Sequence, residues 1–251
     1  MDRYTRMRSA SRQGGFTLVE LMVTVAIAMF LLAGLVTIVQ NIRGSYFNQQ
    51  QLVQLQDEQR FALTVLTDAV QAAGYIPNPT GNTLATAFPN AGPFGQGWVF
   101  AGTHVAGVPD TLSTRFQSGP SATGNPTGGV VLCDGTDTSN TPQQVWTLTF
   151  SVDPVQGLQC SVNGAPAVTL VGGVTGFTVL YGVKRNVAPV DYNVDTYETW
   201  DVLAASGSDW ANISAVRVVL TFKNPITGPN QPATIDMERV VQVMARGGVH
   251  T

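Results

Sequence analysis

The feature that most constrains this chain is a run without a charged side chain, from residue 21 to residue 42. At a rise of about 1.5 Å per residue, a helix of this length can cross a hydrocarbon core of about 30 Å. Every later apolar stretch is broken after a few residues by Gly, Pro, Asn or Thr. The sequence therefore predicts a single membrane-spanning helix.

The charges are distributed unevenly around this run. Four of the 13 basic residues, Arg3, Arg6, Arg8 and Arg12, lie in the first 15 residues. By the positive-inside rule they keep the N-terminus in the cytoplasm and direct everything after the span to the other side. The remaining chain holds nine bases against 15 acids, and it has no basic patch with interleaved aromatic residues that would suit a nucleic acid. We therefore expect an extracytoplasmic body that does not bind nucleic acid.

A second pattern lies immediately before the apolar run. Gly14-Gly15 is followed by Phe16-Thr17-Leu18-Val19-Glu20. In an ordinary secretory signal the small residues of the cleavage site follow the apolar region, whereas here they precede it. An acid in a membrane helix costs about 2.5–3.5 kcal/mol at the helix centre and less near the interface. Something should therefore compensate the charge of Glu20.

These residues resemble the N-terminus of type IV prepilins, which have a short basic leader, a glycine and then a Phe-Thr-Leu-x-Glu motif that opens a long apolar helix. The resemblance implies that residues 1–15 are a leader, that prepilin peptidase cuts between Gly15 and Phe16, and that the new Phe16 amine is methylated. It also implies that Glu20 aligns an incoming subunit with the filament. An interfacial Glu20 that only extends its carboxylate to water is the alternative.

The helix is expected to continue beyond the membrane, so that residues 16–42 span the membrane and residues 43–74 form an amphipathic half. Apolar residues step by three and four along one face of the second half, and Gly74, Pro77 and Pro79 then end the helix. A heptad coiled coil is the alternative, but the stripe is short and lacks regular flanking charges. The stripe consists of Leu52, Leu55, Gln59, Ala62, Leu66, Ala69 and Ala73, with Leu63 and Val70 beside it.

Residues 75–251 are expected to form a β-rich head. Residues 75–129 are rich in Gly, Pro, Asn, Thr and Ser and predict mostly loop, and the strands follow them. An antiparallel sheet against the second half of the helix gives an α+β, pilin-like fold with long loops. The predicted strands are residues 129–133, 145–152, 158–162, 168–171, 177–181 and 216–222.

The chain has two cysteines, Cys133 and Cys160, and both lie in the exported part, where disulfides persist. Each lies in a predicted strand, and the segment between them can fold back. We expect a disulfide that contributes about 3–4 kcal/mol to stability in the chain-entropy model. Two buried free thiols are the alternative.

Several head segments resemble the PilW-type minor pilins. They are Leu132-Cys133-Asp134-Gly135, Phe150-Ser151-Val152, Gly157-Leu158-Gln159-Cys160, Leu170-Val171-Gly172-Gly173-Val174, Val179-Leu180-Tyr181-Gly182-Val183 and Asp209-Trp210-Ala211-Asn212-Ile213. The resemblance implies a minor pilin that helps to initiate a type IV pilus, with a position at the tip. It also implies that the chain sits in the inner membrane with its head in the periplasm, and then in the pilus at the cell surface.

The partners implied by this resemblance are prepilin peptidase, other minor pilins, the major pilin, the inner-membrane assembly machinery and a tip adhesin. A minor pseudopilin of a type II secretion system is the alternative, because it shares the N-terminal motif. A membrane-anchored periplasmic enzyme or binding domain is a third reading, but it leaves Gly15, Phe16 and Glu20 unexplained.

The sequence offers little for catalysis or metal binding. The two histidines, His104 and His250, are far apart, no cysteine pair has ligand spacing, and the common nucleophile and phosphate-loop motifs are missing. We expect no enzyme activity and no cofactor. A weak calcium candidate is Asp191, Asn193 and Asp195, whose spacing starts many calcium loops, but Thr196 replaces the glycine and Val202 the glutamate of an EF-hand. A solvated acidic loop is the favoured interpretation of that segment.

Overall fold

The computed structural model describes residues 15–77, 82–118, 130–185, 193–206, 209–226 and 228–244. The chain forms two compact units, Met1–Gln50 and Gln51–Thr251. The long helix α1 (Leu18–Ala72) begins in the first unit and ends in the second. The two units are described in turn.

In the first unit, α1 presents apolar side chains that none of the described residues covers. Among the described residues, α1 is the one helix long and apolar enough to cross a membrane. Its residues up to Gln50 are all exposed, including Leu21, Phe30 and Leu31. Such a surface is stable in lipid or against other apolar helices rather than in water. It fits the membrane span expected at residues 16–42.

In the second unit, α1 buries the predicted stripe. The residues that pack inward are Leu55, Gln59, Ala62, Leu63, Leu66, Ala69 and Val70, followed by Ala73 just after the helix. Leu52 is 36% exposed, so the buried stripe starts one turn later than predicted. The helix ends at Ala72, and Gly74 follows with a φ of 80°, a conformation that glycine adopts without strain.

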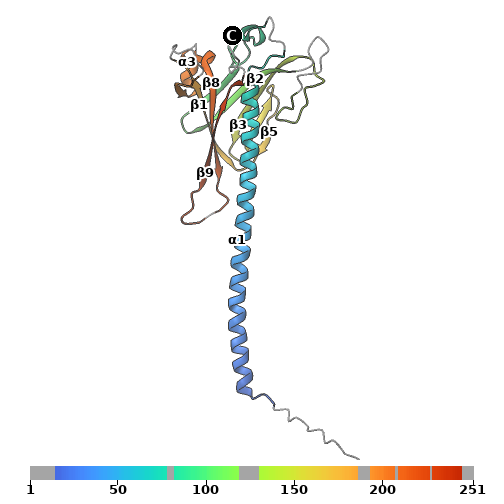
Figure 1. The fold of residues 1–251 in the computed structure, drawn as a ribbon, viewed down its shortest axis with the longest axis vertical. Coiled ribbons are helices and arrows are strands. Elements are labelled where there is room, and N and C mark those ends of the chain that lie inside the picture. Colours follow the sequence, from blue (N-terminus) through green and yellow to red (C-terminus); the bar gives the residue numbers. More distant parts are fainter. Residues whose placement is uncertain are drawn as a thin grey trace, which may run out of the picture. The chain divides into compact units, whose positions relative to one another are not determined.

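Two antiparallel sheets make up the head (Figure 1). The first sheet contains β1 (Phe100–Val105), β2 (Val108–Ser118), β3 (Gln144–Asp153), β4 (Gly157–Val162) and β5 (Val168–Val171), side by side in chain order. The second contains β6 (Val174–Val183), β7 (Thr196–Glu198), β8 (Ile213–Lys223) and β9 (Thr234–Gln242), in the order β7-β6-β8-β9. The short helix α2 (Leu84–Ala87) lies between α1 and β1, and α3 (Trp200–Ser206) and the 3₁₀ helix η1 (Asp209–Asn212) lie between β7 and β8. The predicted α+β class is confirmed.

The details of the strands differ from the prediction in three ways. The strands form two sheets rather than one. Residues 100–118 were expected to be loop but form β1 and β2, because β2 is buried on both faces and hides its polar residues inside the head. The strand predicted at residues 129–133 is wrong over its described part, where Val131 makes only an isolated bridge to Asp137. The strands β7 and β9 were not predicted.

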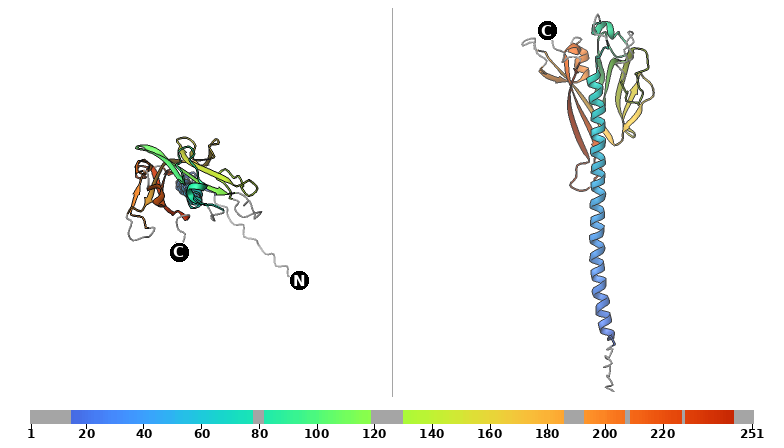
Figure 2. Two further views of the ribbon diagram at one scale, coloured as in Figure 1. Left: turned by 90° about the horizontal axis from the view of Figure 1, so that it is seen from above. Right: turned by 45° about the vertical axis from the view of Figure 1, so that its right-hand side comes forward.

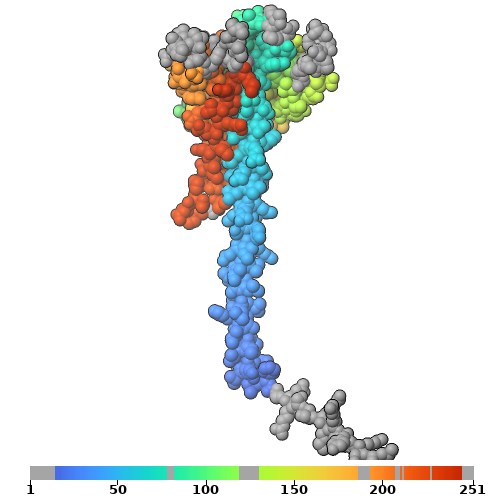
Figure 3. All heavy atoms as spheres, viewed as in Figure 1, coloured from blue at the N-terminus to red at the C-terminus, as the bar shows by residue number. Residues whose placement is uncertain are grey.

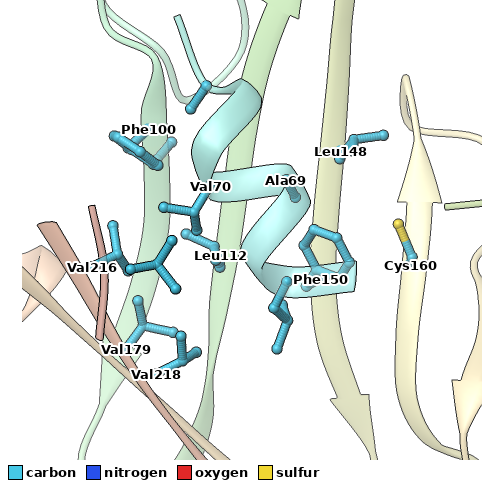
Figure 4. Packing of buried hydrophobic residues seen from close by; sticks show 14 of the residues in the cluster. Ala69, Val70, Phe100, Leu112, Leu148, Phe150, Cys160, Val179, Val216 and Val218 are labelled. Carbon is cyan, nitrogen blue, oxygen red and sulfur yellow. The ribbon is translucent and has the colours of Figure 1, made fainter. Parts of the chain in front are cut away.

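The core of the head lies where α1 passes between the two sheets. The view from above in Figure 2 shows the head part of α1 between the green and yellow strands of the first sheet and the orange and red strands of the second. Figure 4 shows Ala69 and Val70 among side chains of both sheets, including Leu112 and Phe150 from the first and Val216 from the second. Ala62, Ala69 and Ala73 on the buried face belong to the same hydrophobic core.

Candidate functional site

The predicted cleavage site lies in exposed backbone ahead of the helix. Gly15, Phe16 and Thr17 have no regular secondary structure, and α1 begins at Leu18. The Phe16 side chain is 81% exposed. A peptide bond in this position is accessible to a protease, because no helical hydrogen bond has to be broken to reach it.

Thr17 and Glu20 shape the first turn of α1. The Thr17 hydroxyl accepts a hydrogen bond from the backbone N–H of Glu20 at 3.3 Å, as an N-cap side chain does. Glu20 is the acidic residue of the first turn, where the helix dipole favours a negative charge. Its side chain is exposed. The geometry therefore leaves the Glu20 carboxylate near the start of the helix, accessible to an amine from outside the chain.

The structure joins Cys133 to Cys160 by a disulfide across 6.3 Å between their Cα atoms. Cys160 lies in β4 and is fully buried, whereas Cys133 lies in the segment that precedes β3. That segment turns at Gly135, which has a φ of 85°. The disulfide therefore fastens an irregular segment to β4, next to the edge of the first sheet.

A pocket of about 420 Å³ lies between α1 and the segment held by this disulfide. Phe61, Val65 and Asp68 line it from the helix, and Val131 and Cys133 line it from the other side. Asp68 is the one ionisable side chain in its lining.

The calcium candidate falls partly outside the described residues, because Asp191 is not among them. The carboxylate of Asp195 accepts a hydrogen bond from the backbone N–H of Arg185 at 2.9 Å, and its own N–H donates to the Val183 carbonyl. Asp195 thus makes hydrogen bonds to the end of β6 and to the residues that follow it. Within the described ranges, no group of three His, Cys, Asp or Glu residues could hold a metal ion.

A buried polar site that no sequence pattern predicted joins the two sheets. Asp110 on β2 is 3% exposed, and its carboxylate lies 2.8 Å from His104 Nδ1. The other carboxylate oxygen accepts the backbone N–H of Val179 on β6 at 2.8 Å. Burial, and then the nearby charge of Asp110, raises the pKa of Tyr181 well above its usual range. Asp110 follows a proline in a segment that looks like loop, so no sequence pattern pointed to it.

A second buried polar residue, Arg115 on β2, holds the loop between α2 and β1 by hydrogen bonds. Its guanidinium is almost fully buried and lies over the rings of Phe88 and Phe94. Burial lowers the pKa of Arg115 to about 10, so the group stays charged at neutral pH. It donates to four backbone carbonyls, those of Trp98, Pro89, Gly95 and Phe88. Arg115 therefore stabilises the loop between α2 and β1, and this role needs no ligand.

Comparison with known families gives two matches. Residues 10–36 match the prokaryotic N-terminal methylation motif, and residues 140–241 match the family Type IV Pilus-assembly protein W. The second match starts just before β3 and ends in β9, so it includes parts of both sheets. No curated protein and no solved structure matches the chain. A match to a prepilin-type methylation motif and a match to the Type IV Pilus-assembly protein W family thus lie in one chain, and together they support a minor pilin of a type IV pilus.

Proposed function

We propose that this minor pilin takes part in the initiation of a type IV pilus and is placed at or near the tip. One observation carries the proposal: the methylation motif opens an uncovered apolar helix in a chain whose head matches the Type IV Pilus-assembly protein W family. The motif supports processing and entry into a filament. The head family supports a role among the minor pilins.

Processing is the first step of this function. Prepilin peptidase hydrolyses the peptide bond between Gly15 and Phe16, and the new amine of Phe16 is then methylated. The support from the structure is that this bond lies in exposed, non-helical backbone two residues before α1. Because the bond precedes the apolar helix, the mature chain stays anchored in the inner membrane by α1 with its head in the periplasm.

Assembly is the second step, and Glu20 has the main role in it. When α1 of a new subunit packs among the apolar helices of the filament, its carboxylate leaves water. An unpaired carboxylate in that environment is unfavourable, whereas the Phe16 amine of a neighbouring pilin compensates it. This charge pair therefore favours one position of the new subunit along the filament axis over other positions. The partners in this step are other minor pilins, the major pilin, the inner-membrane machinery and a tip adhesin.

A deletion strain tests the proposal. Surface pili are counted by electron microscopy, the major-pilin level is checked by immunoblot, and retraction is disabled in a parallel strain. We expect few or no pili at an unchanged major-pilin level, with partial recovery when retraction is disabled. Normal pilus numbers in the deletion strain would contradict a role in initiation.

The same strain separates the proposal from a minor pseudopilin of a type II secretion system. A pseudopilin would leave the pili intact and would reduce export of secreted proteins. The match to a pilus-assembly family favours the pilus. Neighbouring genes for other minor pilins and a large tip adhesin would support it further, and secretion-channel genes would count against it.

A further inference from the structure

One strand edge of the head stands out from the others. The first sheet ends in β1 and β5, and the second ends in β7 and β9. β5 has four residues and β7 has three. β1 has a register irregularity between Thr103 and Val105, and α3 packs against it. β9, by contrast, is nine residues long, pairs with β8 in an unbroken register and contains no Pro or Gly.

The hydrogen bonds at the two ends of the β8–β9 ladder fix which backbone groups of β9 face away from β8. Val243 N–H donates to the Ser214 carbonyl and Asn224 N–H donates to the Ala233 carbonyl, both at 2.9 Å. Opposed residues in an antiparallel ladder alternate between hydrogen-bonded and non-hydrogen-bonded pairs. Starting the alternation from either of these two pairs assigns the same residues of β9 to the free edge. The residues whose N–H and C=O groups point to the free edge are Thr234, Asp236, Glu238, Val240 and Gln242.

We propose that the free edge of β9 is a docking site for an extended strand of another pilus subunit, which adds to the second sheet of the head. An edge of this length and regularity readily pairs with a further strand unless something blocks it. The segment that contains β9, in red in Figure 3, lies at the surface of the view shown there. The five residues whose backbone groups point to the free edge have exposed side chains.

The two faces of β9 specify the chemistry of the incoming strand. Ile235, Met237 and Val241 lie on one face and are buried or half-buried, and the exposed Arg239 lies on that face between Met237 and Val241. Asp236 and Glu238 lie on the other, and both are exposed. Cross-strand neighbours stabilise a sheet when apolar side chains meet and when opposite charges meet. The partner is therefore an extended segment in which apolar residues alternate with Lys or Arg.

The acids of β9 are held in place for this contact. Asp236 accepts a hydrogen bond from the Thr221 hydroxyl at 2.7 Å, and Glu238 pairs with Arg217 at 2.6 Å, both from β8. Glu238 is still 47% exposed. Asp236, whose partner is a neutral hydroxyl, gives a base on the incoming strand a fixed target, whereas the charge of Glu238 is shared with Arg217.

The same charges disfavour a second copy of this chain as the partner. If two β9 strands paired across a two-fold axis at Met237, Asp236 of each would lie opposite Glu238 of the other. An axis at Glu238 would place that residue opposite itself, and an axis at Arg239 would do the same with Arg239. Like charges directly opposite each other are destabilising. These three registers therefore disfavour a second copy, whereas a basic strand meets opposite charge on the acidic face.

Photo-crosslinking in cells tests the site with the full chain. Benzoyl-phenylalanine replaces Val240, and a matched control carries it at Val155, which is 92% exposed on the turn between β3 and β4. We expect an adduct with another pilus subunit from position 240, mapped by mass spectrometry to an extended segment with alternating Lys or Arg. Equal adduct formation from both positions, an adduct only with a second copy, or no adduct from position 240 would overturn the proposal.

A proline substitution tests the backbone edge itself. Val240→Pro removes an N–H that points to the free edge and leaves the hydrogen bonds to β8 intact, whereas Val240→Ala keeps that N–H. With the photoprobe at Gln242, we expect Val240→Pro to reduce the adduct about tenfold relative to Val240→Ala, the effect of one lost hydrogen bond. An equal adduct from both variants would contradict edge pairing.

A second variant covers the case in which the proline variant folds poorly. Asp236→Lys reverses a charge on the exposed face, and Asp236→Asn only removes it. We expect the adduct to fall more with Lys than with Asn, because Lys repels the bases of the incoming strand. An adduct unchanged in both variants would contradict the proposed charge pattern.

This inference rests on the proposed function, because the partner is another pilus subunit, but the two fail differently. Normal pilus numbers in the deletion strain would overturn the proposed function. Normal adduct formation by the Val240→Pro variant, in a strain that does need the chain for its pili, would overturn only the β9 docking site.

Discussion

At the residue scale, Glu20 carries a charge that the helix N-terminus favours and the membrane disfavours. Its charge suits the first turn of α1, yet it lies at the start of an apolar segment. Glu20→Gln keeps the shape and removes the charge. We expect normal cleavage after Gly15 and at least a tenfold loss of the chain from sheared filaments, because the pairing with a neighbour's amine is lost. Immunoblots of membrane and filament fractions measure both.

Thr24→Val is a matched control for Glu20→Gln, since it also changes an exposed polar side chain in the same part of α1. Thr24 donates only to the Leu21 carbonyl of its own helix, at 2.9 Å. The control variant should enter filaments as the natural chain does. If Glu20→Gln also enters filaments normally, Glu20 has no part in alignment.

Tyr181 governs how the head responds to alkaline pH. Burial, and then the charge of Asp110, raises the pKa of this phenol above its ordinary value of 10.0. The folded state therefore holds the proton to higher pH than the unfolded state does. This contribution to stability is fully present below about pH 10 and is lost as the pH rises further.

The corresponding variant is Tyr181→Phe. We expect the Tm of the natural chain to fall more steeply than that of the variant as the pH rises from about 9 to about 11, because the variant has no phenol to ionise. Thermal unfolding followed by circular dichroism measures the two slopes. Parallel slopes would show that the buried phenol does not couple folding to pH.

At the element scale, the second half of α1 is stabilised by what it buries. Leu66 is fully buried between the sheets, whereas Leu52, on the same stripe, is 36% exposed. We expect Leu66→Ala to lower the free energy of unfolding by about 2–5 kcal/mol and Leu52→Ala by less than about 0.5 kcal/mol. Unfolding of the detergent-solubilised chain compares them. Similar losses for both would mean that the stripe does not pack as described.

The disulfide is the second feature that stabilises the head at the element scale. Cys133 and Cys160 are 27 residues apart in the chain. Replacing both with Ala should lower the free energy of unfolding by about 3–4 kcal/mol, because the unfolded chain gains the freedom of the opened loop. Reduction of the natural chain serves as the control and should cause a similar loss. A double variant as stable as the oxidised chain would contradict a structural role for the disulfide.

Sequence patterns predicted some elements well and others not at all, for physical reasons. β3, β4, β5, β6 and β8 were predicted because their β-branched and aromatic residues are bounded by turns. β2 carries Arg115 and Asp110 into the interior, where their partners come from distant segments, so its sequence looked like loop. β9 could have been found, because Thr234-Ile235-Asp236-Met237-Glu238 alternates polar and apolar residues, but Asp and Glu are depleted in strands and weaken the signal.

Some residues of the candidate site could be predicted from the sequence, and others could not. The motif from Gly15 to Glu20 is contiguous, so it could be read from the sequence alone. The pairing between Asp110 and the N–H of Val179, and the free edge of β9, depend on strands that meet only in the folded head. No local pattern encodes such contacts.

At the scale of the whole molecule, the two family matches lie in different units of the chain. The methylation motif covers residues 10–36 in the first unit, and the Type IV Pilus-assembly protein W match covers residues 140–241 in the second. The first accounts for an apolar helix that the chain leaves uncovered, and the second for a head with two sheets. The proposed function rests on both matches together.

Mass spectrometry of the N-terminus of this chain in purified, sheared filaments tests the central claim most directly. The account predicts a mature chain that starts at N-methylated Phe16, present at much lower abundance than the major pilin. A chain that keeps residues before Phe16, or one found in the membrane fraction but never in filaments, would contradict it.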